Sequence, residues 1–412
     1  MSNASNTPSL ARHRWYYFKE GFSPSLVNHA IQDTKLRKGD TLIDPFNGSG
    51  TVTLTAAQAG ISSLGIEVNP FASFLGATKL SRTSPEVFSK ERQGILAGVK
   101  RGATSFLENT STFSRESSNT GRWLFNKEIL RAFEGGWRKA SRLNKTTRDL
   151  YYLALIGSAM DTCNATRDGK CLRYRKNWDT DKLREDDFLE SLEKRMDIIQ
   201  EDLAQSRILT PGVIKTGDVR RVLDRTNNRF RLCVTSPPYL NSFDYSDIYR
   251  PELFLGHFIK TNQELRKLRM STVRSHVQVA WKDPSESNFG ALYERTIKEI
   301  ELHSEELWSK RIPFMIQAYF EDMGKVLKRL KQLALPRASL WLVVSTSAYA
   351  GIEVPVDLIL ADVGVKSGWY LREVAVLRYL RSSSQRSKVS GENNKLRESV
   401  IIFDTNPVRK II

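Results

Sequence analysis

The chain has 412 residues, 40% of them hydrophobic, which suffices for one large α/β domain with an insertion or for two domains. No apolar run approaches the roughly 20 residues of a membrane span, and three cysteines without a C-x-x-C pair support neither a disulfide framework nor a zinc cluster. The formal charge of +17 favours nucleic acid over a membrane surface as partner, and we expect a reducing, cytoplasmic compartment.

The first 80 residues predict alternating strands and helices. Residues 41–43 form an expected buried strand, and residues 49–59 an expected helix that ends before Gly60. A second strand at 63–66 ends on Glu67, and a further helix begins near Pro70. Such β-α-β-α alternation predicts a parallel, doubly wound sheet, of which residues 1–80 form the N-terminal part.

The strand signal disappears over residues 81–208, which we interpret as a helical insertion. Its expected helices span 86–107, 127–143, 147–160 and 185–204. The core resumes over 209–412, with a polar segment at 260–311. The expected strands there are 213–215, 232–234, 339–345, 370–378 and 399–403, and the expected helices are 312–333 and 356–363. The chain therefore predicts one split α/β domain.

A glycine-rich loop follows the first strand, reading Asp44-Pro45-Phe46-Asn47-Gly48-Ser49-Gly50-Thr51. Glycines let backbone amides approach a ligand closely at the positive end of the next helix. Glu67 lies near the roughly 20-residue offset at which an acid meets ribose hydroxyls. The loop lacks the lysine of ATP-binding loops and a strict G-x-G-x-x-G, so it favours a nucleoside cofactor. The alternative is an ordinary tight turn.

A second motif, Thr235-Ser236-Pro237-Pro238-Tyr239, directly follows an apolar strand and so lies at the carboxyl edge of the sheet. The Ser236 hydroxyl and the Pro237 carbonyl are candidate acceptors for the hydrogens of a base amine, and the prolines restrict the backbone. Tyr239 is suited to stack on a base swung out of its duplex. The alternatives are a stiff loop with a packing tyrosine and a peptide ligand of WW-type modules.

Together and in this order, the two motifs resemble the amino-group DNA methyltransferases that use S-adenosylmethionine. Ser-Pro-Pro-Tyr is typical of the N4-cytosine enzymes, whereas N6-adenine enzymes more often carry Asp or Asn in place of Ser236. The resemblance covers about residues 15–80, 210–260 and 310–405. It implies a Rossmann-like class I methyltransferase sheet, mostly parallel with a C-terminal antiparallel strand, acting on a flipped base in double-stranded DNA.

The resemblance also implies the site residues and the setting. Ser236, Pro237, Pro238 and Tyr239 would hold and activate the base. The cofactor would contact Phe22, Ser23, Asp44, Pro45, Phe46, Gly48, Gly50, Thr51, Glu67, Asn69 and Asp218. The setting would be bacterial restriction–modification, with a cognate restriction endonuclease as candidate partner. The open alternatives are N6-adenine methylation, methylation of RNA, and a nucleic-acid-binding homologue that has lost catalysis.

Two basic groups are candidates for phosphate contact, with a solvated charged face as the alternative for each. The first, in the insertion, comprises Arg167, Lys170, Arg173, Arg175 and Lys176. The second, which includes Arg381 and Arg386, lies in a Ser-rich loop between the last two strands. We expect the insertion to read the DNA sequence, with segment 260–311, including Arg274, Ser275 and His276, as the alternative.

Overall fold

A seven-stranded sheet is the centre of the computed structural model, which describes residues 9–18, 20–118, 120–168, 171–180, 182–380 and 396–407. The strand order is β10-β11-β7-β6-β1-β2-β5. The strands are β1 (Thr41–Asp44), β2 (Ser62–Glu67), β5 (Gly212–Thr216), β6 (Phe230–Thr235), β7 (Ala334–Ser345), β10 (Tyr370–Tyr379) and β11 (Arg397–Asp404).

Five neighbouring strands of this sheet, β7, β6, β1, β2 and β5, run parallel. Ile43 of β1 lies opposite Leu64 of β2 on one side and Cys233 of β6 on the other. Strand β11 is antiparallel to both of its neighbours, β7 and β10. The predicted Rossmann-like sheet, mostly parallel with a C-terminal antiparallel strand, is confirmed.

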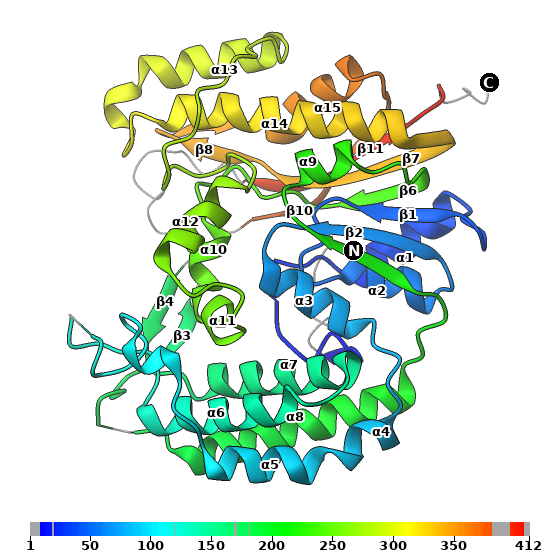
Figure 1. Cartoon of the computed structure of the whole chain (residues 1–412). Coiled ribbons are helices and arrows are strands. Elements are labelled where there is room, and N and C mark those ends of the chain that lie inside the picture. Colours follow the sequence, from blue (N-terminus) through cyan, green and yellow to red (C-terminus); the bar gives the residue numbers. More distant parts are fainter. Residues whose placement is uncertain are drawn as a thin grey trace.

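Helices cover both faces of the sheet, as Figure 1 shows. One face carries α1 (Pro24–Asp33), α2 (Thr51–Gln58) and α3 (Pro70–Lys79), and the other carries α9 (Val219–Asp224), α14 (Ile312–Leu333) and α15 (Val356–Lys366). Successive strand residues alternate between the two faces. Leu42 packs in the cluster of α1 and α2, whereas Ile43 packs in the cluster of α14 and α15. The sheet is therefore buried on both sides, which accounts for its apolar strands.

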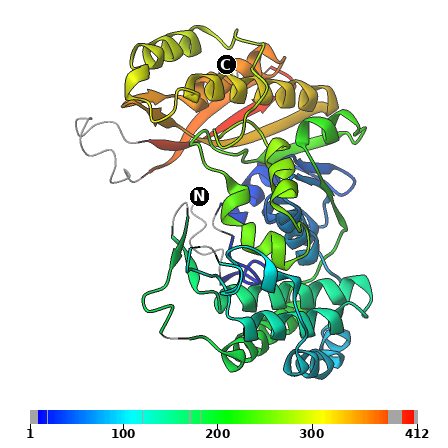
Figure 2. The same cartoon turned by 60° about the vertical axis from the view of Figure 1, so that its left-hand side comes forward.

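The insertion between β2 and β5 forms a layer of helices beneath α3 (Figures 1 and 2). Phe71 and Leu75 of α3 share one apolar core with Phe88 and Leu155 of the insertion. Its helices are α4 (Pro85–Lys90), α5 (Arg92–Arg101), α6 (Lys127–Ala140), α7 (Lys145–Asp161) and α8 (Glu185–Gln205), with a 3₁₀ turn at Phe106–Asn109. The four predicted helical stretches are thus present, the first of them divided.

The expectation of an insertion without strands is wrong, because β3 (Ala165–Asp168) and β4 (Cys171–Tyr174) form an antiparallel hairpin. Ala165 is the one fully buried residue of these two short strands. Such a half-exposed pair lacks the apolar alternation by which strands are recognised in a sequence.

A short N-terminal segment ties the insertion to the sheet domain. Arg12, only 2% exposed, donates through Nη1 to the carbonyls of Lys79 and Ser81 at 2.7 Å each. Its Nη2 donates to the carbonyl of Ser206, just beyond α8, at 2.7 Å. The backbone amide of Arg12 donates to Asp202 of α8. One arginine thus joins the ends of α3 and α8.

The remaining elements lie along the C-terminal half. Helices α10 (Tyr245–Ile248), α11 (Arg250–Leu255) and α12 (Asn262–Met270) lie between the sheet and the insertion (Figure 2). Helix α13 (Ala291–Leu302) packs near α14, and β8 (Ser347–Tyr349) pairs with β9 (Ile352–Val354). Within the described ranges, no helix has both the length and the apolar character needed to cross a membrane.

Candidate functional site

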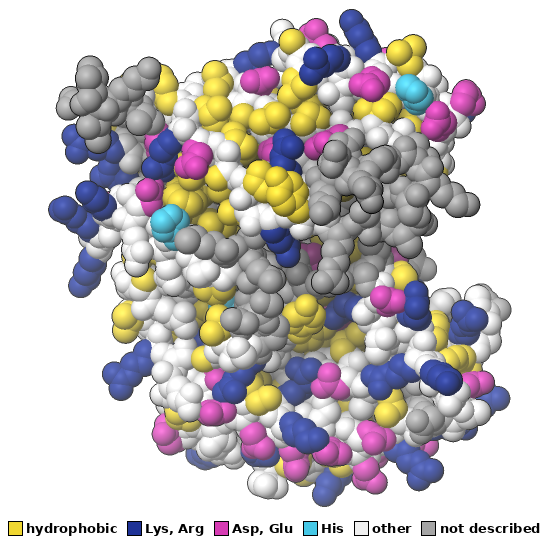
Figure 3. All heavy atoms as spheres, turned by 180° about the vertical axis from the view of Figure 1, so that it is seen from behind, with side chains coloured by type: hydrophobic (Ala, Val, Ile, Leu, Met, Phe, Trp, Pro, Cys, Tyr) yellow, Lys and Arg dark blue, Asp and Glu magenta, His cyan; other side chains and the backbone are white. Residues whose placement is uncertain are grey.

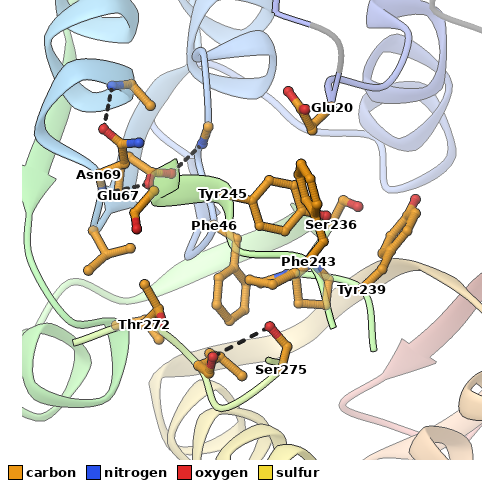
Figure 4. Close-up of a pocket in the computed structure, with 18 of the residues that line it drawn as sticks. Glu20, Phe46, Glu67, Asn69, Ser236, Tyr239, Phe243, Tyr245, Thr272 and Ser275 are labelled. Atoms are coloured by element: carbon orange, nitrogen blue, oxygen red, sulfur yellow. Dashed lines mark hydrogen bonds between the residues drawn. The ribbon is translucent and has the colours of Figure 1, made fainter. Parts of the chain in front are cut away.

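The two sequence motifs meet in one cavity of about 490 Å³ at the carboxyl ends of β1, β2 and β6. Gly48 of the first motif lines it together with Glu67, and the Ser236–Tyr239 loop lines it from the other motif. Figure 4 shows Glu67 on one side and Tyr239 on the other, with Phe46 between them. A position at the carboxyl edge of a parallel sheet is where ligands bind in open α/β folds. The geometry expected from the order of the motifs is therefore present.

Asp44 joins the two motifs from behind the lining. Its Oδ1 accepts hydrogen bonds from the Thr235 hydroxyl at 2.6 Å and from the Phe46 amide at 3.0 Å. The side chain is 1% exposed, and burial raises the pKa of Asp44 to about 7. Its predicted contact with a cofactor stays a prediction, and what the structure shows is a bridge between the ends of β1 and β6.

Glu67 organises the backbone of the glycine loop. Its Oε2 accepts from the amide of Gly48 at 2.7 Å, and its Oε1 accepts from the amide of Asn69 at 2.8 Å (Figure 4). Burial raises the pKa of Glu67. The Asn69 side chain in turn accepts from the amide of Phe71 and caps α3. One carboxylate therefore fixes both the loop after β1 and the turn after β2.

The rest of the glycine loop packs inward. Gly50 has φ 86°, and a Cβ there would lie 2.9 Å from the Cα of Gly76, so this glycine allows α2 and α3 to approach closely. Thr51, the first residue of α2, is buried. Pro45 lines the cavity beside Phe46 and Gly48. The loop thus presents Pro45, Phe46 and Gly48 to a ligand and uses the next turn for packing.

Three further predicted cofactor residues lie at helix starts. Phe22 lines the cavity, whereas the neighbouring Ser23 accepts from the amide of Ser25 and caps α1. Asp218 caps α9, and its carboxylate pairs with Arg220 at 2.8 Å. Arg220 also pairs with Asp322 of α14. Gly217, rather than Asp218, is the residue of this turn that lines the cavity.

Aromatic rings surround the Ser-Pro-Pro-Tyr side. Phe46, Phe243 and Tyr245 lie around Ser236, with the Tyr239 ring further along the same loop (Figure 4). Phe243 and Tyr245 pack edge to face with their centroids 4.6 Å apart. The Tyr239 hydroxyl donates to Glu398 at 2.7 Å. This half therefore combines aromatic rings with the polar groups of Ser236 and Glu398, a lining suited to a planar ring with polar edges.

Several lining residues were not predicted as site residues. They are Phe18, Glu20, Gly217, Tyr249, Ser271, Thr272 and Glu398. Glu20 accepts from the Tyr249 hydroxyl at 2.5 Å, and the Phe18 ring stacks on Tyr249. The aromatic stretch that begins at Trp15 was a usable signal for Phe18. The others are brought in by contacts that no local pattern reveals.

The basic run of the insertion divides into partly buried and exposed members. Arg167 donates to the Tyr16 hydroxyl at 3.1 Å, pairs with the buried Glu252 and lies 4.6 Å from the Tyr249 ring centroid. Arg167 is therefore occupied within the protein. Arg175 donates to the carbonyl of Asp161.

Arg173 and Lys176 of the same run are exposed, and Arg173 pairs with Asp168 at 2.9 Å. Figure 3 shows basic and acidic side chains intermingled over the helical part of the back face. Lys170, Arg381 and Arg386 lie outside the described residues. In segment 260–311, Arg274 is buried and pairs with Glu321 and Asp322, while Ser275 and His276 line the cavity.

No family model matches the chain. Among curated proteins, it is 27% identical over 442 residues to the type II methyltransferase M.BsoBI of Geobacillus stearothermophilus, covering 95% of this chain and 85% of that protein. It is 24% identical over 423 residues to the type II methyltransferase M.AvaI of Anabaena variabilis, covering 96% and 86%. Identity to the type II methyltransferase M.MvaI of Kocuria varians is 19% over 436 residues, covering 98% and 93%.

These matches span nearly the whole chain, and with the sheet order and the rim cavity they show a methyltransferase. The chain is thus similar over nearly its whole length to proteins named type II methyltransferases, and the resemblance drawn from its two motifs is confirmed at that level. A solved rRNA methyltransferase, aviRa from Streptomyces viridochromogenes, shares only 11% identity with this chain at a TM-score of 0.33, covering 98% of this chain and 93% of that one.

Proposed function

We propose that the protein transfers a methyl group from S-adenosylmethionine to the exocyclic N4 amine of cytosine in DNA, on a base flipped out of the duplex. The observation that carries this proposal is the shared cavity, in which the glycine loop and the Ser-Pro-Pro-Tyr loop face one another. The Asp44–Thr235 bond joins the strands that bear them. Whole-length relatives named type II methyltransferases support the class of reaction.

The half of the cavity lined by Phe22, Phe46, Gly48 and Glu67, called the cofactor half here, fits S-adenosylmethionine. The whole cavity, at about 490 Å³, lies within the roughly 300–1,000 Å³ of small-molecule sites. Each Glu67 oxygen accepts one backbone amide and keeps a further acceptor position for a ribose hydroxyl. Phe22 and Phe46 supply apolar walls. When bound, S-adenosylmethionine supplies an electrophilic sulfonium methyl group.

The half lined by the Ser236–Tyr239 loop, called the base half, orients the target base and supplies no covalent nucleophile. The Ser236 hydroxyl and the Pro237 carbonyl are the acceptors for the amine hydrogens, and hydrogen bonds to both draw the nitrogen toward tetrahedral geometry. The two prolines fix the direction of that carbonyl. Tyr239 offers its face to the extruded ring, which offsets part of the few kcal/mol that flipping costs. The amine itself is the attacking group.

The substrate assignment depends on charge and on the serine. The net charge of +17 suits a polyanion, and Arg173 and Lys176 are exposed candidates for phosphate contact on the insertion. Lys170, Arg381 and Arg386 remain predicted contacts, and residues 81–208 remain the region that we expect to read the sequence. Ser236, in place of Asp or Asn, favours cytosine over adenine.

Product analysis tests the proposal directly. The purified protein is incubated with labelled S-adenosylmethionine and unmethylated genomic DNA, and the DNA is hydrolysed to nucleosides, with Ser236→Ala as the variant expected to lose transfer. We expect labelled N4-methylcytosine. N6-methyladenine without N4-methylcytosine would overturn the choice of base, and label in RNA alone would overturn DNA. Failure to bind S-adenosylmethionine by calorimetry would overturn the proposed activity and favour a non-catalytic nucleic-acid-binding protein.

A further inference from the structure

The Tyr239 ring is held at its hydroxyl by a carboxylate from the last strand of the sheet, β11. Its hydroxyl donates to Glu398 Oε1 at 2.7 Å. The Glu398 side chain lines the cavity, although the residue is only 4% exposed. Arg378 holds the same carboxylate through Nε to Oε2 at 2.8 Å and Nη2 to Oε1 at 3.1 Å. Both Glu398 oxygens therefore have a charged donor.

The strand register fixes where Glu398 points. On β11 it lies opposite Arg378 of β10 and opposite Ser345 of β7. Its neighbours Arg397 and Ser399 project to the other face, where both bind Asp357 of α15 at 2.8 and 2.7 Å. Because strand side chains alternate, clamping these two residues directs Glu398 into the cavity.

The Tyr239 hydroxyl also remains a hydrogen-bond donor near neutral pH. Burial, and then the neighbouring Glu398, raise the pKa of Tyr239 well above its ordinary value. The hydroxyl therefore stays protonated and remains a donor. A buried carboxylate that lost this donor would keep Arg378 but leave acceptor capacity unused, which is unfavourable away from water.

We propose that Glu398, held by Arg378, is a positioning residue that fixes the Tyr239 ring as a rigid wall of the base pocket. This inference rests on the proposed function. A ring held both at its backbone and at its hydroxyl is already immobilised when a base arrives, so stacking does not have to order it. The extruded ring then meets a surface of fixed position beside the Ser236 hydroxyl. A role in sheet stability alone is the competing explanation.

A double-mutant cycle separates the two explanations. Tyr239→Phe removes the hydroxyl and keeps the ring, and Glu398→Ala removes the acceptor. We expect each single change to lower kcat/KM for unmethylated genomic DNA about tenfold, as for the loss of a hydrogen bond to a charged group. The double variant should be no worse than Glu398→Ala, because the two groups act as a unit. The dissociation constant for S-adenosylmethionine should not change in any of them.

Conservative and control variants keep the test decisive. Glu398→Gln retains an oxygen for the Tyr239 hydroxyl and should recover kcat/KM to within about threefold of wild type. Asp404→Asn removes another acid–arginine pair between β10 and β11, the one with Arg372, and should leave kcat/KM unchanged while it lowers Tm. If Glu398→Ala does not fold, Tyr239→Phe and Glu398→Gln still give the comparison.

The inference is overturned if Glu398→Ala keeps the wild-type kcat/KM, or if the single effects multiply in the double variant. It is also overturned if the Asp404→Asn and Glu398→Ala variants lose activity equally. A wild-type protein that transfers no methyl group would show instead that the proposed function is wrong, and that outcome is visible before any variant is made.

Discussion

The two halves of the cavity are held in place by contacts of different range along the chain. In the cofactor half, Glu67 accepts from amides that lie 19 and 2 residues away, those of Gly48 and Asn69. In the base half, Tyr239 is held by Glu398, 159 residues further on. The cofactor half is thus fixed by one βαβ unit, whereas the base half requires the distant antiparallel strands.

This difference indicates which changes each half tolerates. Substitutions on β10 and β11 should alter how the base is held and leave cofactor affinity unchanged. Substitutions in the βαβ unit should reduce cofactor affinity first. The Asp44–Thr235 bond is the place where the two halves meet, so changes there should affect both.

The largest effect is expected from Glu67→Ala. Two backbone amides lose a charged acceptor, and a bound ribose would lose one too, so S-adenosylmethionine affinity should fall about 100-fold or more. Calorimetry measures the dissociation constant, with Glu67→Gln as an intermediate case and Glu353→Gln of β9, whose carboxylate pairs with Arg397, as the control. Unchanged affinity would contradict the assignment of the cofactor half.

Gly50→Ala should be the next most harmful. The new Cβ would lie 2.9 Å from the Gly76 backbone at a φ of 86°. Gly39→Ala is the matched control, because φ there is 100° and nothing lies within 4 Å. Urea unfolding should show Gly50→Ala to be about 2 kcal/mol less stable than Gly39→Ala. Equal stabilities would mean that close helix approach at Gly50 is unimportant.

Thr235→Val breaks the bridge between the halves. Asp44 would lose its hydroxyl donor while staying buried, at a cost of about 1.5 kcal/mol in the free energy of unfolding. Both cofactor affinity and kcat should decline, unlike in Glu67→Ala, where binding dominates. Thr235→Ser keeps a hydroxyl and should behave like wild type. A change in only one of the two parameters would argue against a shared bridge.

The smallest effect concerns Lys79, which supports the cofactor loop from behind. Its ammonium is 1% exposed and donates to the Ser49 carbonyl at 3.0 Å, and burial lowers the pKa of Lys79 to about 7. Because the pKa of Lys79 is lower in the folded than in the unfolded protein, the unfolded state binds more protons between these values. The free energy of unfolding therefore falls as pH falls from about 10.4 toward about 7.

Between pH 9 and pH 8, the free energy of unfolding of the wild type should therefore fall by about 1 kcal/mol more than that of Lys79→Met. Parallel curves for the two proteins would show that Lys79 does not titrate in this range. Base-half measurements, such as the Tyr239→Phe effect on kcat/KM, should be the same at both pH values.

Local patterns predicted most of the fold. The helix at 312–333 was expected with the bounds that α14 has, since its apolar spacing is long and regular. The strand ending in Asp44 and the strand before Ser236 were likewise predicted from short apolar runs. Parallel strands end at one edge, and this was enough to predict that the two loops meet.

Side-chain partners were not predictable in the same way. Arg167 looked like a phosphate ligand beside its basic neighbours, yet it pairs with Glu252, 85 positions away. Asp218 resembled an acid that contacts the cofactor, but its carboxylate pairs with Arg220, which in turn pairs with Asp322. Burial and ion pairing of a side chain depend on which helices pack together, and the local sequence pattern does not show this.

The segment that contains Arg12 has a consequence for folding during synthesis. The residues from 9 to 22 are translated before the insertion, and they include Phe18, Glu20 and Phe22 of the cavity wall. Arg12 finds its acceptor at Ser206 and its amide finds Asp202, about 190 residues later. Because nascent chains emerge from the N-terminus onward, this segment can meet the end of α3 early, but its contacts with α8 form only after α8 has been translated. This wall of the cavity is therefore fully fixed only when the insertion is present.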